Sequence, residues 1–254
     1  MILSPVVDYG FASTTLADVD QGWLGRKRFD RKYFLRADHL DLLLGNKPDD
    51  YLILEIAEKK SFEYQTEYLD TPDLLCYRDH AQGKQRRAKV RIRTYLDSGL
   101  SRLEVKLRLG NWQSLKVAAE GVKTFSNAQF SFVEDALQSH FSQSELLGRV
   151  SDLQTTSLNT FTRCTLLSNS GLERITIDSA ISTLISDRRF SLAPELFLVE
   201  VKSLKRNSQV ASELLKHGHR AIRFSKYCAG LDMIQPDRPL VHRRSFLRSN
   251  FHEN

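Results

Sequence analysis

Charged residues occupy every second position in two neighbouring segments, 89–95 (KVRIRTY) and 103–109 (LEVKLRL). Successive side chains of a strand point to opposite faces, so each segment would have one apolar face and one charged face. Two such strands side by side would gather cations and one carboxylate on a single surface, which suits a polyanion. A charged face that only meets solvent is the alternative, and for one strand alone it is the commoner case.

The same alternation recurs in segments 28–32, 174–178 and 200–202, opposite residues that are mostly Val, Ile, Leu and Phe. If these faces turn inward, the charges would line a water-filled tunnel and the apolar faces would meet covering helices. The repetition favours a tunnel over simple solvation. The charged positions are Arg28, Asp30, Lys32, Lys89, Arg91, Arg93, Glu104, Lys106, Arg108, Arg174, Asp178, Glu200 and Lys202.

Many cations with one or two carboxylates suit a chain of phosphates. Arg binds phosphate oxygens with two parallel hydrogen bonds, and Lys acts as a point charge. A carboxylate can hold a divalent cation that bridges phosphate oxygens. Phosphoryl transfer then depends on positioning and electrostatic stabilisation, which such a surface provides.

The elements that position these residues are mainly strands. Alternation predicts about eight of them, near 28–35, 61–70, 89–95, 103–109, 112–118, 159–167, 172–178 and 195–202. Helical spacing predicts helices at 37–44, 126–153 and 208–222. This order is typical of an antiparallel barrel or sandwich, and the sequence has neither a Gly-rich phosphate loop nor a βαβ rhythm. Asp70 and Asp73 are expected to set the turn at Thr71-Pro72 rather than to bind metal.

The chain has 254 residues and a formal net charge of +6, which indicates an anionic partner: nucleic acid, a phosphate-rich compound or a membrane surface. No aromatic platform accompanies the basic strands, so a nucleic acid is disfavoured. Cys76, Cys164 and Cys228 have no metal-ligand spacing and predict reduced thiols in the cytoplasm. We expect no signal peptide and no membrane span.

Several ordered motifs, covering roughly residues 26–232, resemble the VTC domain of the CYTH-like triphosphate tunnel metalloenzyme superfamily. The resemblance divides the chain into an N-terminal extension (1–25), a VTC domain (26–232) and a basic, loosely attached C-terminal tail (233–254). The motifs are RFDRKY (28–33), YLDTPDLLCY (68–77), KVRIRTY (89–95), LEVK (103–106), RITID (174–178), LVEVK (198–202) and FSKY (224–227).

This resemblance implies an α+β fold with an eight-stranded antiparallel β-barrel tunnel and helices on the outside. It also implies an ATP-dependent polyphosphate polymerase, which moves the γ-phosphoryl of ATP onto a growing polyphosphate chain and releases ADP. Mn²⁺ or Mg²⁺ is the implied cofactor, and ATP and inorganic polyphosphate are the implied partners. The location would be cytoplasmic, with membrane association only through a membrane-protein partner.

Matched position by position, the resemblance implies roles for individual residues. The phosphate-binding cations are Lys32, Arg91, Arg93, Lys106, Lys116, Arg163, Arg174, Lys202 and Lys226. Metal binding falls to Glu200 and Glu104, and catalysis to Arg91, Arg93, Lys106 and Glu200.

Three positions depart from the related patterns. Arg28 lies where CYTH hydrolases have the first Glu of Glu-x-Glu-x-Lys, which disfavours a metal-dependent hydrolase. Asp30 lies where VTC domains usually have Glu, and Phe161 where a Tyr is expected. A triphosphate or short-polyphosphate hydrolase, and a non-catalytic module that binds polyphosphate or inositol phosphates, remain the alternatives.

Overall fold

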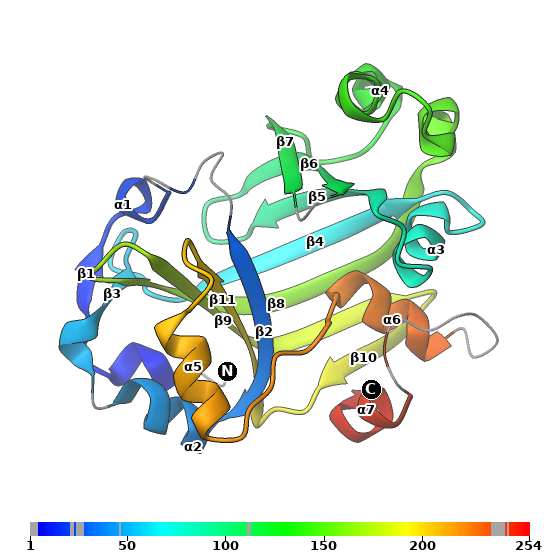
Figure 1. Cartoon of the computed structure of the whole chain (residues 1–254). Coiled ribbons are helices and arrows are strands. Elements are labelled where there is room, and N and C mark those ends of the chain that lie inside the picture. Colours follow the sequence, from blue (N-terminus) through cyan, green and yellow to red (C-terminus); the bar gives the residue numbers. More distant parts are fainter. Residues whose placement is uncertain are drawn as a thin grey trace. The chain divides into compact units, whose positions relative to one another are not determined.

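Long strands are the main regular elements of the fold (Figure 1). The computed structural model describes residues 5–20, 23, 28–45, 47–110, 113–234, 242 and 244–254. Parts of the predicted extension and tail lie outside these residues. The α+β class and the antiparallel sheet are confirmed.

Eight strands have eight or more residues, and they correspond one for one to the eight that alternation predicts. They are hydrogen-bonded in the order β2-β11-β9-β8-β4-β5-β6-β7. These strands are β2 (Phe29–Arg36), β4 (Phe62–Asp70), β5 (Arg86–Tyr95), β6 (Leu100–Gly110), β7 (Gln113–Glu120), β8 (Gln154–Ser168), β9 (Glu173–Ile185) and β11 (Leu196–Ser203).

Shorter strands complete the sheet in the described part of the chain. They are β1 (Ala12–Thr14), β3 (Tyr51–Leu54), β10 (Arg188–Leu192) and β12 (Phe251–Glu253). β1 runs parallel to β3, with Ala12 opposite Leu52, so part of the predicted N-terminal extension belongs to the sheet.

The chain forms two compact units, which we describe separately. Unit 1 comprises Met1–Glu63, Phe161–Ile181 and Leu192–Arg223, and unit 2 comprises Tyr64–Thr160, Ser182–Ser191 and Phe224–Asn254. The divisions at 63/64, 160/161, 181/182 and 191/192 fall inside β4, β8, β9 and β10.

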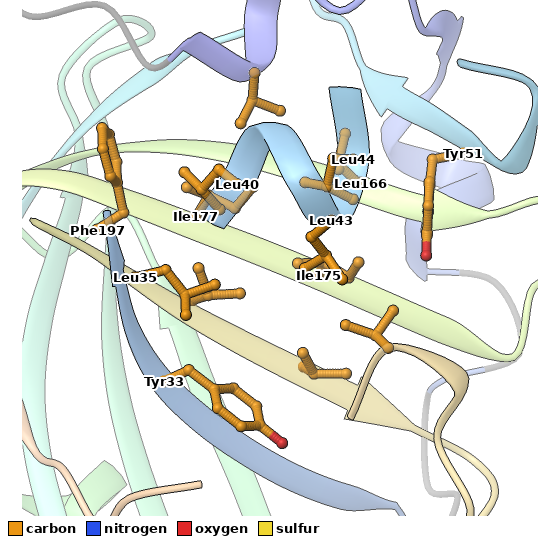
Figure 2. Close-up of a cluster of buried hydrophobic side chains, with 14 of the residues drawn as sticks. Tyr33, Leu35, Leu40, Leu43, Leu44, Tyr51, Leu166, Ile175, Ile177 and Phe197 are labelled. Carbon is orange, nitrogen blue, oxygen red and sulfur yellow. The ribbon is translucent and has the colours of Figure 1, made fainter. Parts of the chain in front are cut away.

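In unit 1, short helices cover the apolar face of β2, β9 and β11 (Figure 2). The sheet contributes Tyr33 and Ile177, and the facing helical segments contribute Leu40, Leu43 and Leu214. All five are at most 3% exposed, and burying each aliphatic side chain contributes about 1.5–3 kcal/mol. The covering elements are α2 (Ala37–Leu40), the π-helical turn η2 (Asp41–Gly45) and α5 (Gln209–Lys216). The other described helical segments of this unit are η1 (Pro5–Asp8), α1 (Leu16–Asp20) and η3 (Pro48–Asp50).

Helix α5 ends six residues before the predicted end at Ile222. Ser208 caps its start by accepting a hydrogen bond from the backbone N–H of Ala211. Gly218 has a φ of +82°, a left-handed conformation that commonly terminates a helix and that glycine adopts without strain.

Unit 2 repeats this arrangement on β5 and β6. Val90, Ile92 and Val105 are fully or nearly fully buried and pack against Val133 and Leu137. A Ser126–Gln129 capping box precedes the helical region that supplies them. The helical elements of this unit are α3 (Leu75–Ala81), η4 (Asn127–Gln129), α4 (Phe130–Phe141), η5 (Glu145–Asp152), α6 (Lys226–Ile234) and α7 (Arg244–Asn250). The apolar faces therefore meet helices, as the alternation predicts.

The described part of the C-terminal tail is packed, so the prediction of a loosely attached tail is wrong there. Leu247 of α7 and Phe251 of β12 are 1% and 5% exposed. β12 pairs with β10, and Arg188 binds Glu253 through two hydrogen bonds of 2.7 Å. The basic residues dominate the sequence of this tail, so its two buried apolar side chains, Leu247 and Phe251, were not predicted.

The three cysteines are buried and free, with no disulfide among them. Among the helices that the structure describes, none has the length and apolar character needed to cross a bilayer.

Candidate functional site

The strand face opposite the α4 core in unit 2 carries ordered rows of charge. Antiparallel pairing places Tyr68 opposite Arg91, and Arg91 opposite Glu104. One row further along, Lys89 lies opposite Lys106, which lies opposite Lys116. Like charges directly opposite one another destabilise a sheet. The row of three lysines is therefore a surface where a bound anion would contribute stability.

Glu104 is the fully buried carboxylate of this face. Arg91 approaches its Oε2 atom with both Nε and Nη2 at 2.6 Å, and Lys116 Nζ lies 3.0 Å from Oε1. Burial opposes ionisation, but Arg91, Arg93 and Lys116 together hold the pKa of this carboxyl well below its ordinary value. Glu104 thus stays charged and orients the Arg91 guanidinium.

Tyr68 joins the same cluster from β4. Its side chain is 7% exposed, its ring stacks on Tyr227 with centroids 4.9 Å apart, and its hydroxyl lies 3.4 Å from Arg91 Nη1. Burial would raise the pKa of the hydroxyl, yet the positive charges of Arg91, Arg93 and Lys226 lower it overall. Cations predicted from two separate motifs, 89–95 and 224–227, therefore act on the hydroxyl of Tyr68.

Lys89 extends the cluster to the start of α6. Its Nζ donates a hydrogen bond of 2.8 Å to Ser225 Oγ, next to Lys226 in the chain. The sequence places Lys89 on the charged face, but the motif comparison gave neither it nor Tyr68 nor Ser225 a role in phosphate binding. The alternation of 62–70 and 89–95 is the signal that could have included Tyr68 and Lys89.

Unit 1 has its own charged face on β2, β11 and β9. Pairing places Lys32 opposite Glu200 and Glu200 opposite Thr176. The adjacent row joins Lys202 to Arg174 on one side and to Asp30 on the other. The predicted residues of this face therefore lie side by side.

Arg163 and Asp178 form a partly buried ion pair in unit 1. Nε and Nη2 of Arg163 lie 2.6 and 2.9 Å from the two oxygens of Asp178. Such a two-point contact fixes the plane of the guanidinium. Arg174, in turn, lies 3.0 Å from Asp20 and 5.3 Å from the centroid of the Trp23 ring.

Lys202 is the titratable group most affected by this environment. Burial, together with the positive charges of Arg174 and Arg163, lowers the pKa of its ammonium to about 7, against the opposing influence of Glu200, whose Oε2 lies 3.8 Å away. A bound anion would restore the proton, so Lys202 is suited to respond to phosphate.

The two predicted metal ligands differ in how well they suit a divalent cation. Glu200 is partly accessible and faces Thr176, whose buried hydroxyl has no hydrogen-bond partner. One carboxylate beside phosphate oxygens is how Mg²⁺ is often held. Both Glu104 oxygens instead contact cations, so a metal ion there would have to displace them.

No cluster of three or more His, Cys, Asp or Glu side chains suited to a metal occurs among the residues that the structure describes. Asp30 is engaged with Arg28, whose Nε lies 3.3 Å from Oδ1.

The role expected for Asp70 is structural. Its Oδ1 accepts hydrogen bonds of 2.8 Å from the backbone N–H groups of Thr71 and Cys76, and its Oδ2 accepts one from Tyr77. These contacts form the turn and begin α3, as predicted. Asp73 also hydrogen-bonds the Thr71 side chain of this turn, and it binds Arg149 and Arg78 in addition.

The charged strand faces carry the motifs of a known family, and the family comparison agrees with them. The model of the VTC domain matches residues 27–235. The chain belongs to the VTC domain family. This membership supports a triphosphate tunnel enzyme that acts on phosphate compounds, in a family that generally binds triphosphates and uses divalent metals.

Solved structures that resemble this VTC domain are distant. A candidate adenylate cyclase from Vibrio parahaemolyticus is 13% identical, with a TM-score of 0.45, over 79% of this chain and 95% of that one. A candidate adenylyl cyclase from Hippeastrum, described as having a dominant triphosphatase activity, is 16% identical with a TM-score of 0.41. That match covers 84% of this chain and 99% of the other. No curated protein matches the chain. The functional argument rests on the family and on the residues themselves.

Proposed function

We propose that this VTC domain is an ATP-dependent polyphosphate polymerase. It would transfer the γ-phosphoryl of ATP to a polyphosphate chain and release ADP. The observation that carries the proposal is the row Lys89–Lys106–Lys116, because three ammonium groups in register favour a repeating anion over a single small one. Family membership supports the same substrate class.

The residues of unit 2 suit phosphate binding and charge stabilisation. Glu104 holds Arg91 in a fixed orientation. Arg93 and Lys226 add positive charge next to the hydroxyl of Tyr68, which Arg91 also contacts. A preorganised set of cations stabilises charge on a transferring phosphoryl group without rearranging during the reaction. Arg91, Arg93 and Lys106 are therefore proposed to act in catalysis.

The residues of unit 1 suit phosphate binding with a metal. Lys32, Arg163, Arg174 and Lys202 supply the cations, and Glu200 would hold Mn²⁺ or Mg²⁺ together with phosphate oxygens. The ion would offset the negative charge of the bridged phosphates. Each of these assignments rests on the family motif and on the strand register.

A hydrolytic function is less well supported. CYTH hydrolases use two carboxylates in Glu-x-Glu-x-Lys, whereas here the first position is Arg28 and the second, Asp30, lies in contact with it. The Arg28–Asp30 pair has no net charge and is poorly suited to hold a metal. This arrangement favours transfer to phosphate over attack by a metal-bound water.

The deciding experiment follows the products of ATP with the purified protein and Mn²⁺. If ADP forms at the same rate as phosphate enters a long, phosphatase-sensitive polyphosphate chain, the result supports the polymerase. If orthophosphate forms without a polymer, the polymerase proposal is wrong and the hydrolase takes its place. If the protein binds polyphosphate without ATP turnover, a non-catalytic binding module takes its place.

A further inference from the structure

His242 belongs to the predicted basic tail, and its side chain lies next to the beginning of α6. The side chain of His242 is 2% exposed and that of Asp232 is completely buried. Asp232 Oδ2 accepts a hydrogen bond of 3.0 Å from the backbone N–H of His242 and lies 2.6 Å from its Nδ1. The tail is thus tied to α6 through two contacts with one carboxylate oxygen.

The opposite nitrogen of the ring reaches the chain just before α6. His242 Nε2 lies 3.1 Å from the backbone nitrogen of Ser225, which can only donate. Nε2 must therefore accept, and Nδ1 carries the proton that it donates to Asp232. The imidazole is neutral and held in a single tautomer.

Asp232 is itself fixed from a third element. The hydroxyl of Tyr77, a fully buried residue of α3, donates a hydrogen bond of 2.6 Å to Asp232 Oδ1. Both carboxylate oxygens are therefore engaged. The network runs without a break from Tyr77 through Asp232 and His242 to the backbone of Ser225.

The end of this network is the phosphate-binding cluster of unit 2. Ser225 Oγ accepts the hydrogen bond from Lys89, and Lys226 is the next residue in the chain. A ring that fixes the Ser225 backbone also fixes where the Lys226 side chain begins. The ring itself lies 5.0 Å from the Phe224 ring, which holds it from the side.

We infer that His242 and Asp232 are positioning residues, which hold Ser225 and Lys226 in the geometry that binds a phosphate chain. This role deepens the proposed function and rests on its phosphate-binding part. Neither residue is proposed to contact phosphate, and the ring comes from the C-terminal tail that was predicted to be basic and loosely attached.

A double-mutant cycle tests this role, with inorganic tripolyphosphate as the probe and affinity measured by titration calorimetry. His242→Ala should weaken tripolyphosphate binding about five-fold, the effect of one lost hydrogen bond. In a Lys226→Ala background the same change should have a smaller effect, because one of the two positioned groups is gone. His252→Ala, an exposed histidine of β12, is the matched control and should bind as wild type.

His242→Gln separates positioning from folding, because its amide oxygen can still accept from the Ser225 N–H. It should bind tripolyphosphate within two-fold of wild type even where thermal melting shows a lower Tm. Equal losses in both backgrounds, a Gln variant as weak as the Ala variant, or a wild-type protein without affinity for tripolyphosphate would each overturn the inference. Tight binding without ATP turnover would instead overturn only the polymerase.

Discussion

Two nitrogens of Arg91, Nε and Nη2, lie 2.6 Å from the same oxygen of Glu104, and Lys116 occupies the other oxygen. The carboxylate is fully buried. A buried charge with partners on both sides contributes little net stability, but its loss leaves those partners uncompensated. Glu104 is therefore best regarded as the fixed point around which the cations of unit 2 are arranged.

Glu104→Gln should lower the free energy of unfolding by about 1–3 kcal/mol at pH 7, because Arg91 and Lys116 lose their counter-charge. Urea unfolding measures this loss of free energy. Glu120→Gln is the control, because Glu120 is an exposed carboxylate that pairs with Arg102. The pKa of Glu104 is lowered by folding, so its contribution is present above the unfolded pKa of about 4.3 and is lost as pH falls below it. A variant with unchanged stability and unchanged acid sensitivity would contradict this role.

Lys202 should make the protein more stable as pH rises from 7 towards 10. Burial lowers the pKa of Lys202 to about 7 in the folded state, against about 10.4 when unfolded. Between these values the unfolded chain binds more protons, so the free energy of unfolding increases with pH. Urea unfolding across this range, with a chelator present, should show a smaller increase for Lys202→Met. Parallel curves for the two proteins would refute the assignment.

Glu200→Gln should reduce metal-dependent ATP turnover by at least about 100-fold, the order of effect seen when one electrostatic contact to a transition state is removed. Retention on immobilised polyphosphate should stay largely intact, because the cations are unchanged. Glu195→Gln, on an exposed side chain just before β11, serves as control. Turnover that survives in the Glu200 variant would show that the metal is held elsewhere.

Tyr68 offers a direct optical readout of the cations around it. The charges of Arg91, Arg93 and Lys226 lower the pKa of its hydroxyl, so wild-type protein should show a tyrosinate absorbance step that Tyr68→Phe lacks. Tripolyphosphate should shift this step to higher pH, because a bound anion cancels part of the positive charge. If tripolyphosphate does not change the pH of the tyrosinate absorbance step, phosphate binds away from Tyr68.

Alternation predicted the eight long strands and their faces because each strand is long enough to repeat the pattern several times. The hairpin between β5 and β6 was also predictable from Asp97-Ser98-Gly99, where Gly99 takes a φ of +68°. The resulting register, with Arg91 opposite Glu104, follows from that turn. Which cation pairs with which carboxylate depends on this register, so the composition of the strands alone does not predict it.

Other features depend on contacts between distant segments and leave little trace in the sequence. β1 and β12 have three residues each, too few to show a period, and pairing with neighbours alone makes them strands. His242 lies in a run of basic residues that suggests only charge, and its function depends on the position of Ser225. Family motifs indicated the cations but not the residues that hold them in place.

The lysine row of unit 2 also affects how the stability of this protein should be measured. Lys89, Lys106 and Lys116 lie opposite one another on adjacent strands, so a bound anion would offset part of their combined positive charge. Any ligand that binds only the folded state raises its stability by mass action. The Tm is therefore a property of the buffer as well as of the chain, higher in phosphate or pyrophosphate than in chloride of equal ionic strength. A simple thermal-shift screen of inorganic anions would rank the ligands that the fold accommodates before any catalytic assay is attempted.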